Sequence, residues 1–308
     1  MGSYIGVFKR KEVKYRMSNG QLDSFMNGIG EHTVHDEFGL TRIYSHYFDT
    51  NVHEIISRSM DKPLYKEKLR LRTYGEPKDE DRVFVELKKK FKGVVYKRRV
   101  GMSYAAALEF LDGMPYEIAC QRFPLQDRYM QVDSLSYKSI QISKEIDAFI
   151  DRNSPLHDAM LIKCDREAFV GIPEDDTDGI DRQLRITFDK NISYMELVPT
   201  RGGLHAREPS NGRILPSEPL DSPTLLLPRG EAIVEIKAMG SYPIWLADLL
   251  EECKAYPSSF SKYGESYSRC YGSLNQHDLS TSQIQTSDNS QNAFRRNTTC
   301  QTISSPQY

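Results

Sequence analysis

The sequence predicts a mainly antiparallel β (α+β) fold in which a closed β-barrel tunnel with a charged lumen is flanked by several short amphipathic helices. Three observations predict it: strands that alternate charged and apolar residues, segments of helical apolar spacing between them, and enough apolar sequence for one large core. The chain has 308 residues, of which 39% are hydrophobic, so it can bury such a core. Its net charge of -2 is close to neutral, so affinity for an anion must depend on where the basic residues lie.

The alternation is clearest in residues 68–72, where three cations share one face of a predicted strand and two leucines share the other. A solvated outer face explains any single strand of this kind. Five such strands together favour a barrel whose charged faces converge inside and whose apolar faces are covered from outside. The charged positions of the other four strands are Arg10, Glu12 and Lys14; Glu86, Lys88 and Lys90; Arg185, beside Thr187; and Glu235 and Lys237.

Four segments between the strands place apolar residues at the i, i+3, i+4 spacing of an amphipathic helix. The first follows Ser18, a potential N-cap, and the second runs over residues 104–112. The other two centre on residues 142–150 and 245–250. We expect these helices to pack against the apolar faces of the strands.

A lumen rich in Lys and Arg repels itself when empty, because two like charges ~4 Å apart cost on the order of 4 kcal/mol at an effective dielectric constant of about 20. Phosphate would neutralise it, since Arg binds phosphate oxygens as a fork and Lys supplies point charges. A carboxylate among these cations is a hard ligand for Mg²⁺ or Mn²⁺. The role of Glu12 and Glu86 stays open between metal binding and ion pairing, whereas for Glu235 the sequence favours the metal role.

Other features bound the class of protein. The five cysteines are widely scattered without a CxxC pair, which argues against a zinc site or a disulfide framework and favours a reducing cytoplasm. No apolar run approaches the ~20 residues of a membrane helix, and the N-terminus lacks the apolar core of a signal peptide. Residues 272–308 are rich in Ser, Thr, Asn and Gln and are predicted to form a disordered polar tail. Residues 1–271 then form the folded domain.

A series of short motifs runs in order along residues 8–263. They are FKRKEVKY (8–15), YFDT (47–50), YKEKLRLRTYG (65–75), FVELKKK (84–90), YKRR (96–99), DREAF (165–169), LRITFD (184–189), VEIK (234–237), PIWL (243–246) and FSKY (260–263). In this order they resemble the catalytic domain of the vacuolar transporter chaperone (VTC) family, a branch of the triphosphate tunnel metalloenzymes in the CYTH-like superfamily.

The resemblance implies an antiparallel tunnel barrel and a metal-dependent polyphosphate polymerase that transfers the γ-phosphate of ATP onto a growing polyphosphate chain. The implied cofactor is Mn²⁺ or Mg²⁺, held by Glu235. The implied partners are ATP and polyphosphate, and export of the product through a membrane would need a separate membrane protein. The implied catalytic cations are Lys14, Arg70, Arg72, Lys88 and Arg185, and these five with Lys97, Arg166 and Lys262 are the implied phosphate and nucleotide contacts.

Some positions depart from the family pattern. Lys9 stands where family members often have Glu, and Arg10 replaces the first Glu of the ExExK signature of related hydrolases. The loss of that metal carboxylate weakens the prediction of a hydrolase more than that of a polymerase. Ser259 replaces a basic residue that often precedes the FSKY motif, so the grip on phosphate at that end is expected to be reduced.

Two alternatives to the polymerase remain open on the sequence. One is a tunnel-fold triphosphatase that uses water as the acceptor, and the other is a non-catalytic module that binds polyphosphate or another polyanion. A nucleic-acid partner is not expected, because the basic run over residues 88–99 lacks the aromatic stacking platform that single strands need.

Overall fold

The structure is a computed structural model that describes residues 10–92, 94–172, 184–197 and 224–272. Residues 1–266 belong to one compact unit and residues 267–308 to a second, of which only the end of one helix and Gly272 are described. Lys9, the side chain of Arg10 and the predicted polar tail beyond Gly272 lie outside the described residues.

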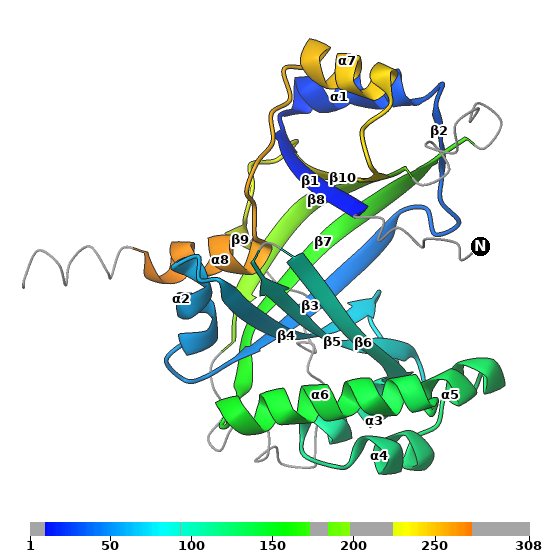
Figure 1. The fold of residues 1–308 in the computed structure, drawn as a ribbon, viewed down its shortest axis with the longest axis vertical. Coiled ribbons are helices and arrows are strands. Elements are labelled where there is room, and N and C mark those ends of the chain that lie inside the picture. Colours follow the sequence, from blue (N-terminus) through cyan, green and yellow to red (C-terminus); the bar gives the residue numbers. More distant parts are fainter. Residues whose placement is uncertain (1–9, 93, 173–183, 198–223, 273–308) are drawn as a thin grey trace, which may run out of the picture. The chain divides into compact units, whose positions relative to one another are not determined.

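The ten described strands form one sheet, and every pairing between them is antiparallel (Figure 1). Eight of them lie in the order β1-β10-β8-β7-β3-β4-β5-β6, while β2 pairs with β7 and β9 pairs with β8. The prediction of a mainly antiparallel sheet is confirmed. The strands are β1 (Arg10–Met17), β2 (Thr33–His35), β3 (Thr41–Asp49), β4 (Tyr65–Tyr74), β5 (Arg82–Phe91), β6 (Val94–Ser103), β7 (His157–Gly171), β8 (Arg185–Glu196), β9 (Thr224–Leu225) and β10 (Ala232–Met239).

The sheet is open, so the prediction of a closed barrel is wrong. It curls into half a barrel, and among the described residues the two edge strands β1 and β6 do not pair with each other (Figure 1). Closure requires the edge strands to share a ladder with a fixed stagger. Here the edge strand β1 bonds to a later segment of the chain instead of β6. Tyr15 bridges to Pro257, and the Ser258 backbone N–H donates to the Lys14 carbonyl at 2.7 Å.

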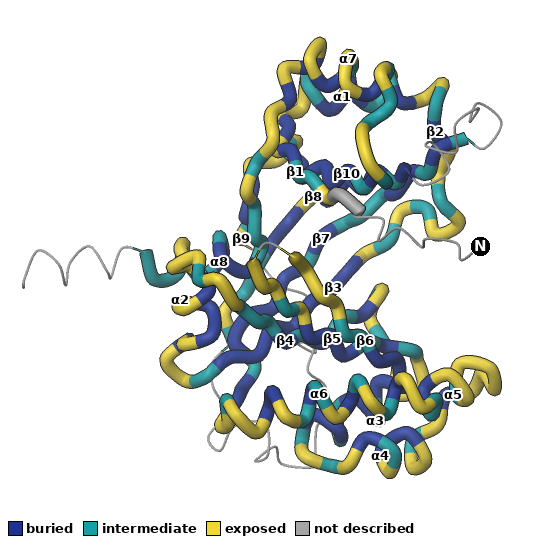
Figure 2. Tube along the Cα trace, viewed as in Figure 1, coloured by how far each residue is buried: buried dark blue, intermediate teal, exposed yellow. Residues whose placement is uncertain are grey.

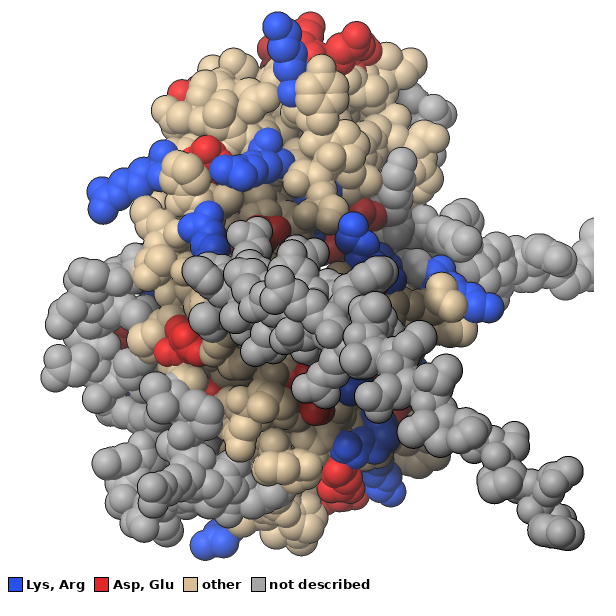
Figure 3. Space-filling model, turned by 90° about the vertical axis from the view of Figure 1, so that its left-hand side faces the viewer, with Lys and Arg blue, Asp and Glu red and all other residues tan. Residues whose placement is uncertain are grey.

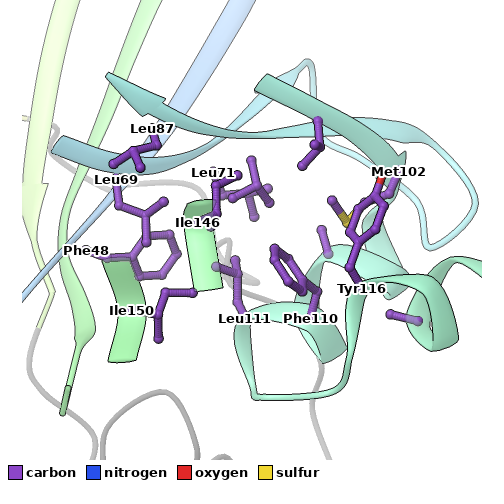
Figure 4. Packing of buried hydrophobic residues seen from close by; sticks show 14 of the residues in the cluster. Phe48, Leu69, Leu71, Leu87, Met102, Phe110, Leu111, Tyr116, Ile146 and Ile150 are labelled. Atoms are coloured by element: carbon purple, nitrogen blue, oxygen red, sulfur yellow. The ribbon is translucent and has the colours of Figure 1, made fainter. Parts of the chain in front are cut away.

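Eight helices are described, and four of them cover one face of β4, β5 and β6. Figure 4 shows Leu69, Leu71 and Leu87 of the strands facing Leu111 and Ile146 of the helices. These residues belong to one continuous buried core. The helices are α1 (Asn19–Ile29), α2 (Glu54–Met60), α3 (Tyr104–Leu111), α4 (Tyr116–Arg122), α5 (Arg128–Ser134), α6 (Tyr137–Asn153), α7 (Ile244–Glu252) and α8 (Lys262–Tyr271).

A second core lies between helices α1 and α7 and the strands β1, β8 and β10. Phe25 and Leu246 of the helices are buried together with Met17, Phe188 and Val234 of the strands. Figure 2 shows the outward sides of these helices exposed while the strands below them are buried. Both cores therefore lie on the apolar faces of the strands, as the alternation predicts.

The four helices predicted from apolar spacing are confirmed as α1, α3, α6 and α7. At the start of α1 the side chain of Gln21 accepts from the Ser18 backbone N–H at 3.0 Å, and at the start of α3 the Ser103 hydroxyl accepts from the Ala106 N–H at 3.1 Å. None of the helices in the described part of the chain is long and apolar enough to cross a membrane.

Candidate functional site

The charged residues of the strands lie on the face that the helices do not cover, which we name the charged face. Leu69 and Leu71 of β4 point to the helices, so Lys68, Arg70 and Arg72 between and beside them point to the opposite side. The same alternation holds in β1, β5, β8 and β10. The charged side chains of this face are Glu12, Lys14, Lys66, Lys68, Arg70, Arg72, Glu86, Lys88, Lys90, Lys97, Arg99, Arg166, Arg185, Asp189, Glu235 and Lys237.

The curl of the sheet brings distant strands of this face within electrostatic reach of one another. Lys14 lies on the edge strand β1, five strands away from β4 in sheet order. Burial and nearby lysines, among them Lys14, nevertheless lower the pKa of Lys68 on β4 to about 8. Burial, followed by the charge of Lys262 and opposed by that of Glu235, likewise lowers the pKa of Lys14. Lys14 and Lys68 also donate to adjacent residues, Phe260 and Ser261, so β1 and β4 face each other across a concave charged face, and its cations act on one another there.

Glu86 is the centre of the largest ion-pair cluster on this face. Its side chain is 1% exposed, and its carboxylate lies 2.6 Å from the Arg70 guanidinium and 2.8 Å from both Lys97 and Arg99. Arg72 lies farther away, at 4.0 Å. Burial alone would raise the pKa of Glu86, but these cations hold it far below its usual range. Of the two roles left open for Glu86, the structure bears out ion pairing.

Asp189 of β8 forms a second cluster that sequence reasoning missed. Its carboxylate is fully buried and accepts from Arg166 of β7 in a fork, at 2.6 and 2.7 Å. Lys262, at the start of α8, also contacts it. Burial would raise the pKa of Asp189, but Lys262 and Arg166 hold it well below its usual range. The LRITFD motif already places Asp189 on the same face as Arg185. Its ion pairs with Arg166 and Lys262, two predicted phosphate contacts, could not be predicted from that motif.

Lys14 and Lys68 have no carboxylate at ion-pair distance among the described residues. Each donates instead to a neutral acceptor in the segment before α8: Lys14 to the Phe260 carbonyl at 2.9 Å, and Lys68 to the Ser261 hydroxyl at 3.0 Å. Arg72 is similar, because its buried Nε has no hydrogen-bond partner among the described residues. Burial and the neighbouring Arg70 lower the pKa of Arg72. Lys14 and Lys68 therefore lack a carboxylate partner among the described residues, and Arg72 shares Glu86, 4.0 Å away, with three closer cations.

Tyr47 of β3 is a second residue that the sequence analysis did not single out, although it begins the YFDT motif. It is buried, its hydroxyl accepts from Arg70 at 3.0 Å, and its ring stacks on Tyr263 with 4.5 Å between ring centroids. Burial alone would raise the pKa of Tyr47, but Arg70, Arg72 and Lys68 lower it to about 8. Tyr47 is thus a phenol held among cations at the middle of the charged face.

The remaining predicted contacts lie farther from these clusters. Arg185 forms an ion pair at 2.8 Å with Asp36, which follows β2, and the structure does not bring it to Glu86 or Asp189. Lys88 is exposed, and the Lys97 side chain is 45% exposed. On the part of the surface seen in Figure 3, Lys and Arg form separate groups, several with Asp or Glu beside them, rather than one continuous basic patch.

Glu235 lies on β10 opposite Lys14 of β1 and contacts Lys237, which lies 3.7 Å from Glu12. Burial would raise the pKa of Glu235, but Lys237 and Lys14 lower it, so the carboxylate is ionised. No three His, Cys, Asp or Glu side chains among the described residues form a cage for a metal ion. One or two carboxylates with substrate phosphates as the other ligands is an ordinary donor set for Mg²⁺. The residues present fit a metal held in that way.

Several solved structures are similar to this chain at low sequence identity, and two of them are as follows. One is a candidate adenylate cyclase from Vibrio parahaemolyticus, with a TM-score of 0.37 and 11% sequence identity over 83% of this chain and 96% of that chain. The other is a conserved hypothetical protein from Pyrococcus furiosus, with a TM-score of 0.32 and 9% identity over 81% of this chain and 98% of that chain. No curated protein matches the sequence.

The family comparison agrees with the resemblance seen in the motifs. The sequence matches the VTC domain over residues 9–271, which includes every described strand and helix that forms the charged face. This match covers far more than half of the chain. The protein belongs to the VTC domain family.

Proposed function

We propose that the charged face binds a chain of phosphate groups and that the protein is a metal-dependent polyphosphate polymerase, which transfers the γ-phosphate of ATP onto a growing polyphosphate chain. One observation carries the proposal: Lys14 and Lys68 are partly buried on a concave face without a carboxylate partner among the described residues, and Arg72 lies 4.0 Å from a Glu86 carboxylate that three closer cations already share. A buried cation without a partner is costly. A bound polyphosphate anion would remove that cost for all three at once.

The other contacts suit the same ligand. The Glu86 carboxylate forms ion pairs with Arg70, Lys97 and Arg99, so the positions of these three cations are fixed before a phosphate binds. Asp189 does the same for Arg166 and Lys262. An arginine that uses part of its fork on a carboxylate keeps other N–H groups for phosphate oxygens.

Phosphoryl transfer requires little covalent chemistry from protein side chains, because most of the catalysis comes from positioning of the reactants and stabilisation of charge. Arg70 would stabilise the charge of the transferred phosphoryl group, and Arg72, Lys14 and Lys68 would hold the phosphates on either side of it. Glu235, together with Glu12, would hold Mn²⁺ or Mg²⁺, which when bound neutralises charge between phosphate oxygens.

A polyphosphate acceptor fits this face better than water. A hydrolase positions an attacking water, commonly with carboxylates and metal. Here Glu86 and Asp189 are buried in clusters of cations, and Glu12 and Glu235 share the single cation Lys237, so none of the four is free of a cationic neighbour. The cations in turn come from β1, β4, β5, β6, β7 and α8, a spread suited to a donor and an acceptor chain held end to end.

The test is to incubate the purified protein with ATP and Mn²⁺ and to size the products. The proposal predicts ADP and a ladder of lengthening phosphate chains with little free phosphate early on. Arg70→Ala should lose this activity, while Arg42→Ala should keep it, because Arg42 pairs with Asp165 on the opposite face. Free phosphate equal to ADP with no chains would identify a triphosphatase instead. No turnover with any divalent metal would leave a polyphosphate-binding module.

A further inference from the structure

The two ends of the charged face differ in chemistry across β4, β5 and β6. At one end Lys66 lies opposite Lys90 and Lys68 opposite Lys88, so this lysine end is entirely cationic. At the other end Arg72 lies opposite Phe84, and Tyr74 follows Arg72 on the same face. We name Tyr74, Phe84 and Arg99 the aromatic end. The proposed phosphate contacts do not use its two rings.

The aromatic end is built from interlocking contacts. The rings of Tyr74 and Phe84 meet edge to face, with 5.9 Å between centroids. The Arg99 guanidinium lies 3.6 Å from the centroid of Phe84, donates to the Tyr74 hydroxyl at 2.8 Å and lies 2.8 Å from Glu86. Tyr74 is thus tied through Arg99 to the carboxylate that orders the phosphate-binding cations.

Gly101, opposite Phe84 on β6, keeps the space that this arrangement needs. A Cβ there would lie 2.7 Å from the Arg82 Nε and 3.1 Å from a ring carbon of Phe84. The Arg82 guanidinium also lies over the Phe84 ring, 5.2 Å from its centroid. Phe84 is thus covered by two guanidinium groups, whereas Tyr74 has, among the described residues, only the more distant Arg99 guanidinium, 5.9 Å from its centroid, and is 46% exposed. Tyr74 is the ring that remains accessible to a ligand.

An accessible ring beside guanidinium groups matches the flat face of a nucleobase. Every nucleobase, whichever of the bases it is, can stack on aromatic side chains and on Arg. Tyr74 lies two residues beyond Arg72, roughly 7 Å along the strand. A ribose can bridge that distance between a base on Tyr74 and a first phosphate at Arg72. The lysine end, which has no ring on this face of β4 and β5, offers only point charges and suits a plain phosphate chain.

We propose that Tyr74, supported by Phe84 and Arg99, is the platform on which the base of the nucleoside triphosphate donor stacks, so that the phosphate chain extends from Arg72 toward the lysine end. This proposal rests on the proposed function and adds the orientation of the donor. It assigns base recognition to stacking rather than to hydrogen bonds, so different nucleoside triphosphates should bind with similar affinity.

The test compares ATP with inorganic tripolyphosphate, which lacks a base, by calorimetric titration without metal. Tyr74→Ala should weaken ATP binding about five- to 150-fold, the ratio that corresponds to the roughly 1–3 kcal/mol of one stacked base. Tripolyphosphate binding should be unchanged. Tyr74→Phe, which keeps the ring but loses the hydroxyl bonded to Arg99, should bind ATP like the wild type. Tyr65→Ala is the matched control, because Tyr65 is 45% exposed on the opposite face.

The outcomes separate this proposal from the proposed function. Equal weakening of ATP and tripolyphosphate by Tyr74→Ala would mean that Tyr74 acts only by holding Arg99, and the platform would be refuted. Unchanged ATP binding in Tyr74→Ala would refute it too, while tripolyphosphate binding by the wild type would leave the proposed function intact. If the wild type binds neither ligand, both proposals fail.

Discussion

Replacement of Glu86 by Gln keeps the shape of the side chain and removes the charge that orders three cations. Removing one partner of a buried ion pair costs about 3–5 kcal/mol. The Glu86 side chain is 1% exposed, but those of Arg70 and Lys97 are 17% and 45% exposed and regain some hydration. We therefore expect the low end, about 3 kcal/mol. For a domain of this size that lowers the melting temperature by roughly 6–12 °C.

Thermal unfolding with and without tripolyphosphate measures both parts of this argument. A ligand at a hundredfold excess over its dissociation constant adds roughly 2.7 kcal/mol, so it should recover most of the loss in Glu86→Gln. Glu145→Gln is the control, because Glu145 pairs with Lys89 and Arg98 on the opposite face, where partly exposed pairs contribute about 0–1 kcal/mol. The reasoning is refuted if Glu86→Gln melts like the wild type, or if both variants lose equally.

Four further predictions follow from the site. Glu235→Gln should abolish metal-dependent turnover while ATP still binds, and turnover near the wild-type rate would show that the metal is held elsewhere. Asp189→Asn should lower the melting temperature and enlarge its rise with tripolyphosphate, and an unchanged rise would argue against a ligand near Arg166. Affinity for tripolyphosphate should fall between about pH 7 and 9 at constant ionic strength. Lys68 loses its proton and Tyr47 ionises in this range, each with a pKa near 8, and both changes lower the positive charge of the site. An affinity that does not change with pH would contradict the placement of the ligand beside these two residues. A chain that ends at Tyr271, where the family match ends, should keep its melting temperature and turnover, and loss of either would assign a role to the tail.

The alternation of charge along the strands could be predicted because it depends on the chain alone. A period of two places Lys68, Arg70 and Arg72 on one face whatever the rest of the sheet does. Closure of the barrel could not be predicted in this way, because it depends on whether the edges of β1 and β6 meet. That edge of β1 instead bonds to Ser258, far along the chain. Helices α2, α4 and α5, of seven residues each, are also too short for a periodic apolar pattern to stand out.

The cations of the site were easier to predict than the carboxylates that hold them. Arg70, Lys97 and Arg166 were predicted from the charged face and the family motifs, but their ion pairs depend on register and on the curl of the sheet. Glu86 joins β4, β5 and β6 only because these strands pair as they do. Asp189 reaches Lys262 only because the segment before α8 crosses the charged face.

The most direct test of the central claim, that the charged face binds phosphate chains, is a calorimetric titration of tripolyphosphate at two salt concentrations. The wild type should bind, and more weakly at higher salt, because the contacts are charged. Arg72→Ala should weaken binding roughly tenfold or more, since a hydrogen bond to a charged group contributes about 1.5–3 kcal/mol. Arg42→Ala, on the opposite face, should bind like the wild type. No binding by the wild type, or equal weakening by the two variants, would contradict the claim.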